Sequence, residues 1–298
     1  MAWTTHPKVM QARQRSAIID VVVELLDGFR RHLTGRNAAV LAYYGFLTLF
    51  PLLMAATTIL GFVLEGNPDL QARIVDSALS RIPVVGADLE PGSTINGSWW
   101  ALFLGLGVAL WGSLKAFVAL QSALDDVWEV PIDDRANGAI QRAKALVGIA
   151  VIGLGQIGAV ALAAVVSEAG LPRLGQMLIT LGGLVLNVIV VGTMYRYLTS
   201  RSVTWGMLWP GAVFTGVLYT VLQFAGTRLV TNTLDDAANV YGTFAATLAL
   251  LSWLSLHALI SLIGAELNAA LTRPRVRSEG PEASMSIPST APAAGADG

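Results

Sequence analysis

The sequence predicts an all-α, polytopic membrane protein, a bundle of six transmembrane helices preceded by an amphipathic helix at the membrane interface. Composition is the first observation behind this prediction. Hydrophobic residues make up 54% of the 298 residues and charged residues only 13%, whereas a soluble domain carries about 25% charged residues. Six windows are also long and apolar enough to span a bilayer, which takes about 20 residues. Finally, Lys and Arg gather in alternate connections between these windows.

The six predicted spans are 38–64, 99–120, 145–167, 176–195, 205–225 and 243–267. So little charge lies between them that buried helices of a soluble protein are a poor alternative. Of the 19 Lys and Arg residues, fourteen fall on the N-terminal side of the predicted membrane, four fall on the other side and Lys115 lies within a span. Because positive charge accumulates on the cytoplasmic side, we expect both termini in the cytoplasm.

The segments outside the spans divide the chain into three parts. Residues 1–36 form a cytoplasmic N-terminal segment, residues 37–272 the transmembrane domain, and residues 273–298 a disordered cytoplasmic tail rich in Pro, Ala, Ser and Gly. Within the first part, residues 16–33 place apolar side chains at helical spacing opposite a charged face. This amphipathic helix could lie on the membrane interface or pack on the cytoplasmic end of the bundle, and both interpretations stay open.

Two connections have patterns of their own. The long outer connection 65–98 predicts a short amphipathic helix, because Asn67, Pro68 and Asp69 are good residues to start one. The cytoplasmic connection 121–144 is acidic but lacks the glycine and the terminal Glu of a calcium-binding loop. We therefore expect a solvated acidic face there, with no metal and no cofactor. Its carboxylates are Asp125, Asp126, Glu129, Asp133 and Asp134.

Polar side chains inside a membrane are costly, so each is a candidate for function as well as for an interhelical hydrogen bond. On the last predicted span, Ser261 and Asn268 share a helical face with His257. Histidine titrates near neutral pH, so this face would suit a proton relay or, equally, hydrogen bonds between helices. The cavity or transport candidates are His257, Gln156, Asn187, Gln223, Ser261 and Asn268.

Two further sets of residues have structural interpretations. Lys115 and Glu266 lie at a similar depth, near the cytoplasmic boundary of the second and sixth spans. We therefore expect them to form an ion pair that joins these helices. In the first span, Pro51 follows Tyr43 and Tyr44 and removes a backbone hydrogen bond near mid-membrane, which predicts a kink.

Two stretches carry a resemblance to a known family. Residues 41–53 (Leu-Ala-Tyr-Tyr-Gly-Phe-Leu-Thr-Leu-Phe-Pro-Leu-Leu) and residues 241–271 (beginning Tyr-Gly-Thr-Phe-Ala and containing Gly-Ala-Glu-Leu-Asn-Ala) resemble the first and last helices of the YihY/BrkB family of bacterial inner-membrane proteins. With the six-helix layout, the resemblance covers about 35–272. Gly45 stands where a serine is common in that family. The positions that match the family pattern are Tyr43, Tyr44, Pro51, Gly242, Gly264, Glu266 and Asn268.

The resemblance implies a location in the bacterial cytoplasmic (inner) membrane but little about activity. Members have been linked to the envelope, with lipid transport suggested, and have carried the name ribonuclease BN, a label regarded as mistaken. Transport of a lipid or other envelope component is one hypothesis, and a structural or assembly factor of the envelope is the alternative. We expect membrane lipids as partners, while a homo-oligomer or an unseen membrane partner stays open.

Several classes of function are disfavoured by the residues themselves. Phosphodiester cleavage needs positioned acid–base groups or metal-binding side chains, and the three histidines (His6, His32 and His257) are far apart in sequence. The spans also carry no carboxylate pair, nucleotide-binding loop or serine-elbow motif. The net charge of −1 argues against nucleic-acid binding. We therefore expect that this protein is not an enzyme and, in particular, not a ribonuclease.

Overall fold

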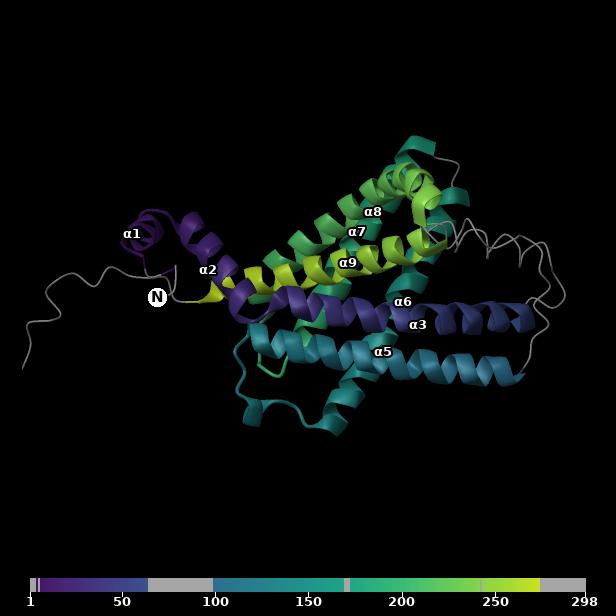
Figure 1. Ribbon diagram of the computed structural model, residues 1–298, viewed down its shortest axis with the longest axis horizontal. Coiled ribbons are helices and arrows are strands. Elements are labelled where there is room, and N and C mark those ends of the chain that lie inside the picture. Colours follow the sequence, from purple (N-terminus) through teal and green to yellow (C-terminus); the bar gives the residue numbers. More distant parts are fainter. Residues whose placement is uncertain (1–3, 5, 64–98, 169–171, 242, 274–298) are drawn as a thin grey trace, which may run out of the picture.

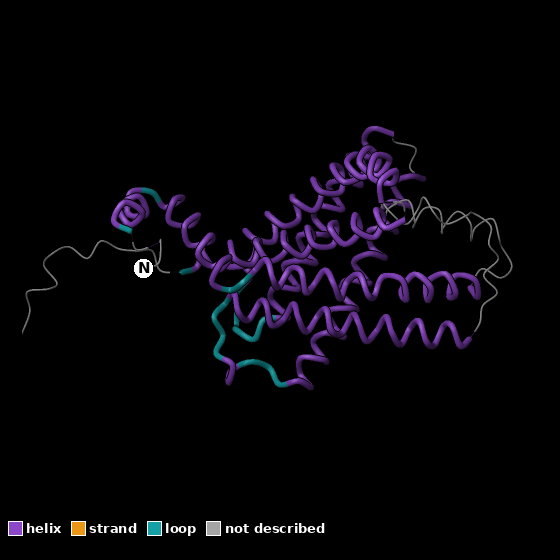
Figure 2. Tube along the Cα trace, in the orientation of Figure 1, coloured by secondary structure: helices purple, strands orange, loops and turns teal. Residues whose placement is uncertain are grey.

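The computed structural model describes residues 4, 6–63, 99–168, 172–241 and 243–273. Within these ranges every regular element is helical (Figure 2), which confirms the predicted all-α class. The elements are α1 (Pro7–Arg15), α2 (Ala17–Arg31), α3 (Thr34–Val63), α5 (Trp99–Val127), η2 (Ile132–Asp134), α6 (Gly138–Glu168), α7 (Pro172–Leu198), α8 (Trp205–Tyr241) and α9 (Thr243–Thr272).

The long helices coincide with the predicted spans, but the count of spans differs. In the described part of the chain, five helices, α5 to α9, contain a stretch long and apolar enough to cross a membrane. α3 occupies the place of the first predicted span but is not among these five, and most side chains of its second half lie outside the described set. The chain is therefore a polytopic helical membrane protein, and its described part contains five such spans where the sequence predicts six.

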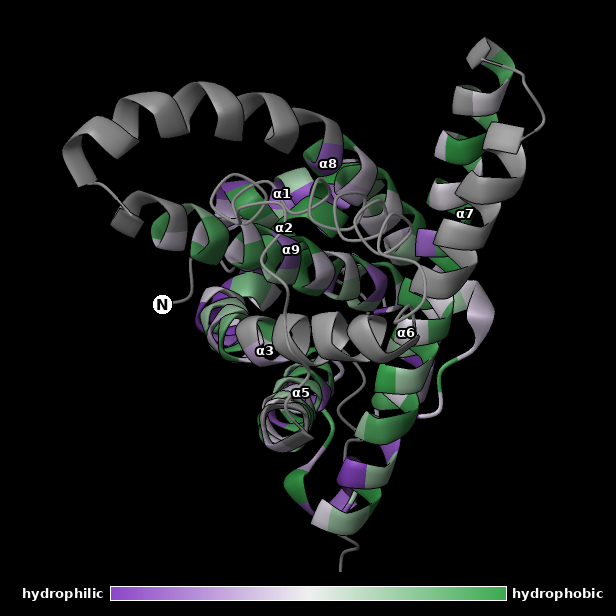
Figure 3. Cartoon of the chain, turned by 90° about the vertical axis from the view of Figure 1, so that its right-hand side faces the viewer, coloured by the Kyte–Doolittle hydropathy of each residue, from purple (hydrophilic) through white to green (hydrophobic). Residues whose placement is uncertain are grey.

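Figure 1 shows how the long helices are arranged. α3 packs along α5 and α9, α9 packs against α8, and α7 packs against both α6 and α8. We call the end at which α3 begins and α9 ends the proximal end; α1 and α2 lie there. From this end, α8 and the far half of α9 rise away from α3 and α5 (Figure 1), and Figure 3 shows α6 and α7 set to one side of them.

Among the residues whose burial is described, the largest buried cluster lies at the proximal end. The main buried cluster combines Leu124 and Trp128 from the end of α5 with Leu198 from α7, Leu208 from α8 and Ala269 from α9. By contrast, only between 11% and 28% of the residues in each candidate span are buried. The remaining apolar surface faces outward, as expected for helices in lipid (green in Figure 3).

The N-terminal segment contains two helices where the sequence predicts one. α2 matches the predicted amphipathic helix and packs against α9. Its polar side faces inward, since Asp20 is buried, whereas Ile18 and Val22 are 76% and 49% exposed. The predicted packing on the bundle is thus observed, and the outward apolar face leaves the predicted contact with the membrane interface open.

The acidic connection is shorter than the sequence predicts. α5 continues to Val127 and α6 begins at Gly138, so only 128–137 join them. Asp125 consequently lies in the last turn of α5 and is 1% exposed, which corrects the expectation of a wholly solvated acidic face. The helix expected within 65–98 and the tail from 274 onward lie outside the described residues.

Candidate functional site

A seam of polar side chains joins α7, α8 and α9. Tyr219 donates a hydrogen bond to the His257 carbonyl oxygen at 3.1 Å and is also bonded to the Ser261 hydroxyl. Tyr195 of α7 reaches the Ser261 carbonyl oxygen and lies 3.0 Å from the Thr215 hydroxyl. Two predicted candidates, His257 and Ser261, therefore share one network, and its hydroxyl groups bond to each other and to backbone.

His257 itself is held within its own helix. Its Nδ1 donates to the carbonyl oxygen of Trp253 at 3.0 Å, because a carbonyl oxygen can only accept. The imidazole ring also lies 4.9 Å from the rings of both Trp253 and Tyr219. Nε2 is the ring nitrogen left for any further proton exchange, and the hydrogen bond made by Nδ1 lies within α9, so it joins no two helices.

The Asn268 side chain bonds to the backbone of α8 around Pro210, an arrangement that we call the Asn268 clamp. Pro210 has no N–H group and so interrupts the hydrogen-bond ladder of this helix. The Asn268 side chain accepts from Gly211 N at 2.6 Å and donates to the Leu208 carbonyl oxygen at 3.0 Å. With no exposed surface, this amide bonds backbone on both sides of the proline. Its role is therefore to join α9 to α8.

Glu266 has different partners from the one the sequence suggests. Its Oε1 accepts from Thr34 Oγ1 and lies against His32 Nδ1, each at 2.8 Å. Glu266 and His32 are buried, whereas Lys115 is exposed and lies 6.0 Å from the centre of the Trp111 ring. The expected Lys115–Glu266 ion pair is thus replaced by a carboxylate–imidazole contact between α9 and the turn before α3.

Charged side chains continue from this contact across the proximal end. Glu24 of α2 pairs with Arg13 at 3.0 Å and with Arg273 at 2.7 Å. Glu129 pairs with Arg273 at 3.2 Å and with Arg31 at 2.9 Å. Its Oε1 also lies 3.7 Å from His32 Nε2. We call Arg13, Asp20, Glu24, Arg31, His32, Glu129, Glu266 and Arg273 the proximal cluster.

The proximal cluster connects α1, α2, the turn after α5 and α9. Isolated exposed ion pairs contribute at most about 1 kcal/mol, but here the side chains of Arg13 and Asp20 are each only 10% exposed and several pairs share atoms. Leu33, which follows His32, and Glu129 of this cluster adopt left-handed backbone angles, with φ of 54° and 52°. Non-glycine residues rarely do so without support from their surroundings.

A second buried carboxylate fixes the loop between α7 and α8. Asp125 accepts hydrogen bonds from Ser200 N at 2.7 Å, from Ser200 Oγ at 2.8 Å and from Thr199 Oγ1 at 3.3 Å. Three donors compensate for the burial of this carboxylate. Among the described residues no three His, Cys, Asp or Glu side chains gather so as to hold a metal ion.

The remaining candidates differ in exposure, and the side chain of one lies outside the described set. Gln223 is exposed and Asn187 is half-buried, while Gln156 lies in α6 where side chains are not described. Tyr43 is 55% exposed and stacks edge-on with Tyr44 at 5.5 Å. Pro51 lies within α3, as the sequence predicts.

The partners of Glu266 could not be read from the sequence. Thr34 and His32 lie more than 230 positions before Glu266. Tyr219, which joins the seam, was not among the predicted candidates, although it lies four residues before Gln223 in the fifth predicted span.

Long apolar helices joined by a polar seam, and held at one end by a buried charged cluster, define a multi-pass helical membrane protein. No solved structure matches the chain. Residues 25–287 match the family described as virulence factor BrkB, and the chain belongs to this family. The resemblance of the first and last helices is thereby confirmed.

Three relatives extend this result. The chain is 33% identical over 138 residues to the inner membrane protein YhjD of Escherichia coli, covering 42% of this chain and 39% of YhjD. It is 28% identical to an uncharacterised Dickeya dadantii protein, covering 35% of this chain and 34% of that protein. A Bacillus subtilis protein with a ribonuclease-like name, YfkH, is 22% identical over 83% of this chain and 94% of its own length.

The match to the first two relatives thus spans less than half of their length. The name of YfkH likens that relative to a ribonuclease, whereas the family description and the name of YhjD state neither a reaction nor a cargo. Together with the spanning helices, they make the chain an inner-membrane protein of the BrkB type.

Proposed function

We propose that this chain moves an amphipathic lipid or other envelope component across the inner membrane. The observation that carries the proposal is the spreading of the helices from one well-packed end. The proximal cluster and the buried core join them at one end, whereas towards the other end α8 and α9 rise away from α3 and α5 (Figure 1). Helices with few buried contacts are the parts of a protein that separate most easily.

The physical requirement for such movement is a path for a polar headgroup past apolar lipid tails. The headgroup needs hydrogen-bonding partners at mid-membrane, and the seam of Tyr195, Thr215, Tyr219, His257 and Ser261 holds such groups between α7, α8 and α9. In the described arrangement these groups bond to one another. Movement therefore requires α8 and α9 to part, so that the headgroup replaces the partners within the seam.

In this proposal transport is passive or proton-coupled, because the sequence carries no nucleotide-binding motif that would allow the chain to use ATP. The proximal end faces the cytoplasm, since most Lys and Arg residues fall on that side. No catalytic step is involved. Hydrolysis of a phosphodiester would need acid–base or metal-binding groups around one point, and His32 and His257 lie apart, in the proximal cluster and the seam.

The test is lipid translocation in vesicles of defined composition. The purified full chain is reconstituted with a trace of phosphatidylglycerol carrying a fluorophore on its headgroup, and dithionite is added outside. Empty vesicles lose about half of the fluorescence, because only the outer leaflet is accessible. We expect a larger loss with the protein, and a smaller one with Tyr219→Phe, which removes the hydroxyl group from the seam.

An alternative follows from the same seam. A polar stripe that bonds only to itself also fits a structural or assembly factor of the envelope. Under this alternative, vesicles with and without protein lose the same half of the fluorescence, with or without a pH gradient. That result would refute transport of phosphatidylglycerol and favour the assembly role.

A further inference from the structure

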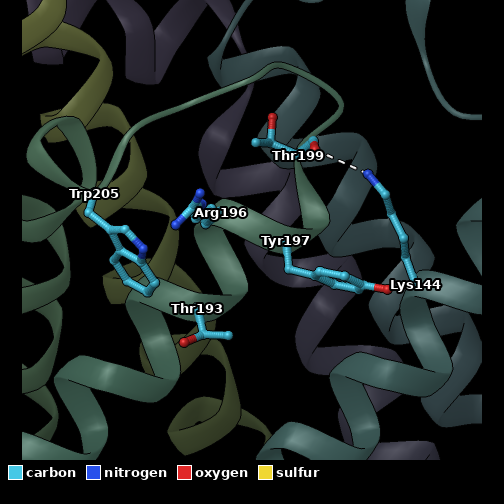
Figure 4. Close-up of a pocket in the computed structure, with 6 residues that line it drawn as sticks. All are labelled: Lys144, Thr193, Arg196, Tyr197, Thr199 and Trp205. Carbon is cyan, nitrogen blue, oxygen red and sulfur yellow. Dashed lines mark hydrogen bonds between the residues drawn. The ribbon is translucent and has the colours of Figure 1, made fainter.

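A pocket of about 280 Å³ lies at the proximal end between the start of α6, the end of α7 and the start of α8 (Figure 4). None of its lining residues belongs to the seam or to the proximal cluster. In Figure 4, Trp205 and Lys144 stand on opposite sides, with Arg196 and Tyr197 between them. The lining residues are Lys144, Thr193, Arg196, Tyr197, Thr199 and Trp205.

The charge of this pocket is positive and uncompensated. Lys144 and Arg196 line it together with no acidic residue. Among the described residues, no carboxylate lies within ion-pair distance of either cation. Lys144 donates to the Thr199 carbonyl oxygen at 3.2 Å, which uses one of its three hydrogens. Arg196 lies over the ring of Trp205, 5.3 Å from its centre, and its planar guanidinium keeps donors for an anion.

The pocket lies where a membrane changes from headgroups to hydrocarbon. The three candidate spans around it are Gly138–Gly155, Met177–Leu198 and Trp205–Gln223. Arg196 is two residues before the end of the second span and Trp205 is the first residue of the third. Trp205 and Tyr197 are 47% and 38% exposed, and exposed Trp and Tyr at this level are typical of the membrane interface.

We propose that this pocket binds the phosphate of an anionic phospholipid, with Lys144 and Arg196 as the phosphate ligands and Trp205 and Tyr197 as its interfacial wall. Basic pockets between transmembrane helices bind anionic headgroups in this way. The volume is near the lower end of the roughly 300–1,000 Å³ of small-molecule sites, which suits a headgroup whose acyl chains stay in the bilayer. A lipid can bind in this pocket without being transported, so the binding site does not depend on the proposed function.

Lipid binding to the purified full chain tests this proposal. The protein in neutral detergent is titrated with phosphatidylglycerol or with phosphatidylcholine, and bound lipids are counted by native mass spectrometry. We expect Lys144→Gln/Arg196→Gln to lower the affinity for the first bound phosphatidylglycerol by roughly thirtyfold, the effect of losing two interfacial cations. Arg196→Gln alone, which removes one cation, should lower it by roughly fivefold. Phosphatidylcholine binding should be unchanged in both variants.

A matched control removes the same charge elsewhere. Arg36→Gln/Arg142→Gln neutralises two exposed arginines at the proximal end and should keep phosphatidylglycerol binding. Equal weakening in this control, or no weakening in the pocket variants, would overturn the proposal.

A competition experiment with inorganic phosphate distinguishes a lipid from a soluble ligand. If it displaces the lipid at millimolar concentration, the pocket is a site for soluble phosphate compounds and the lipid assignment is wrong. Arg196 is exposed, so its single variant should fold even if Lys144→Gln does not.

Discussion

Two glycines bring the backbones of α8 and α9 into contact. A Cβ atom at Gly264 would lie 2.9 Å from the Gly211 carbonyl oxygen and 2.7 Å from the Tyr195 hydroxyl, and closer still to the Thr215 hydroxyl. A Cβ atom at Gly211 would meet the Gly264 carbonyl oxygen and the Asn268 amide. Small residues allow such close approach of membrane helices. The seam and the Asn268 clamp both depend on this crossing.

Gly264→Ala should therefore destabilise the protein by about 1–3 kcal/mol, the usual cost of overpacking a filled site. Gly153→Ala is the control, because a Cβ atom there meets nothing within 4 Å; it should be neutral or slightly stabilising, since Ala favours helix over Gly by about 1 kcal/mol. Reversible unfolding in mixed micelles measures both. Equal stability of the two variants would mean that the α8–α9 crossing is looser than the structure has it.

Single residues were only partly predictable from the sequence. Asn268 and Ser261 could be chosen because a polar group in an apolar span must find a partner. Helical periodicity also places His257 and Glu266 on different faces of α9, and they do have different partners. Depth along a helix could not identify those partners. Lys115 and Glu266 lie at similar depths, but Glu266 is bonded to Thr34 at the start of α3 and lies against His32 in the turn before it.

At the scale of elements, the charged face of α2 attaches this helix to the bundle. Glu24 accepts from Arg273, which follows α9, and from Arg13 of α1, so one carboxylate joins three elements. Its side chain is 19% exposed and that of Arg273 is 21% exposed. Ion pairs of this partly buried kind are worth on the order of 1 kcal/mol. Loss of Glu24 should consequently release α2 without unfolding the bundle.

Glu24→Gln should speed tryptic cleavage after Arg15 and Arg30 by about fivefold, since about 1.4 kcal/mol corresponds to tenfold in an equilibrium. The melting temperature of the bundle should change little. Asp27→Asn is the matched control: Asp27 is three residues away on α2, is half-buried and, among the described contacts, has no ion pair. Fragments are quantified by mass spectrometry. If cleavage is equally slow in both variants, the apolar contacts of α2 hold it without the charges.

The elements themselves were easier to predict than their ends. Apolar runs of about 20 residues identify spanning helices because lipid leaves the backbone no other partner. The ends are set by local contacts instead. α5 extends past its predicted end at 120 to Val127. This extension is stabilised because the buried Gln121 bonds to the Gln141 carbonyl oxygen and the buried Asp125 bonds to Ser200. No hydropathy window contains that information.

At the scale of the whole molecule, the proximal end combines three features. It has the largest buried cluster among the described residues, the proximal cluster and the basic pocket. The helices therefore share a well-packed base, from which α8 and α9 rise away from α3 and α5 (Figure 1). Which leaflet meets the base decides which lipids the pocket encounters and in which direction the proposed movement runs. The orientation of the chain is thus the property on which both proposals depend for their biological meaning.

The absence of cysteine makes this orientation directly measurable, because any introduced thiol is the only one in the chain. Gln14→Cys places a thiol on an exposed position of α1, and Asn67→Cys places one in the connection 65–98. In spheroplasts, a membrane-impermeant maleimide should label Asn67→Cys at once and Gln14→Cys only after lysis, because 14 of the 19 Lys and Arg residues fall on the N-terminal side. The unmodified chain is the control for background labelling. The reverse pattern would place Lys144 and Arg196 in the outer leaflet, and the positive-inside rule would then fail for this protein.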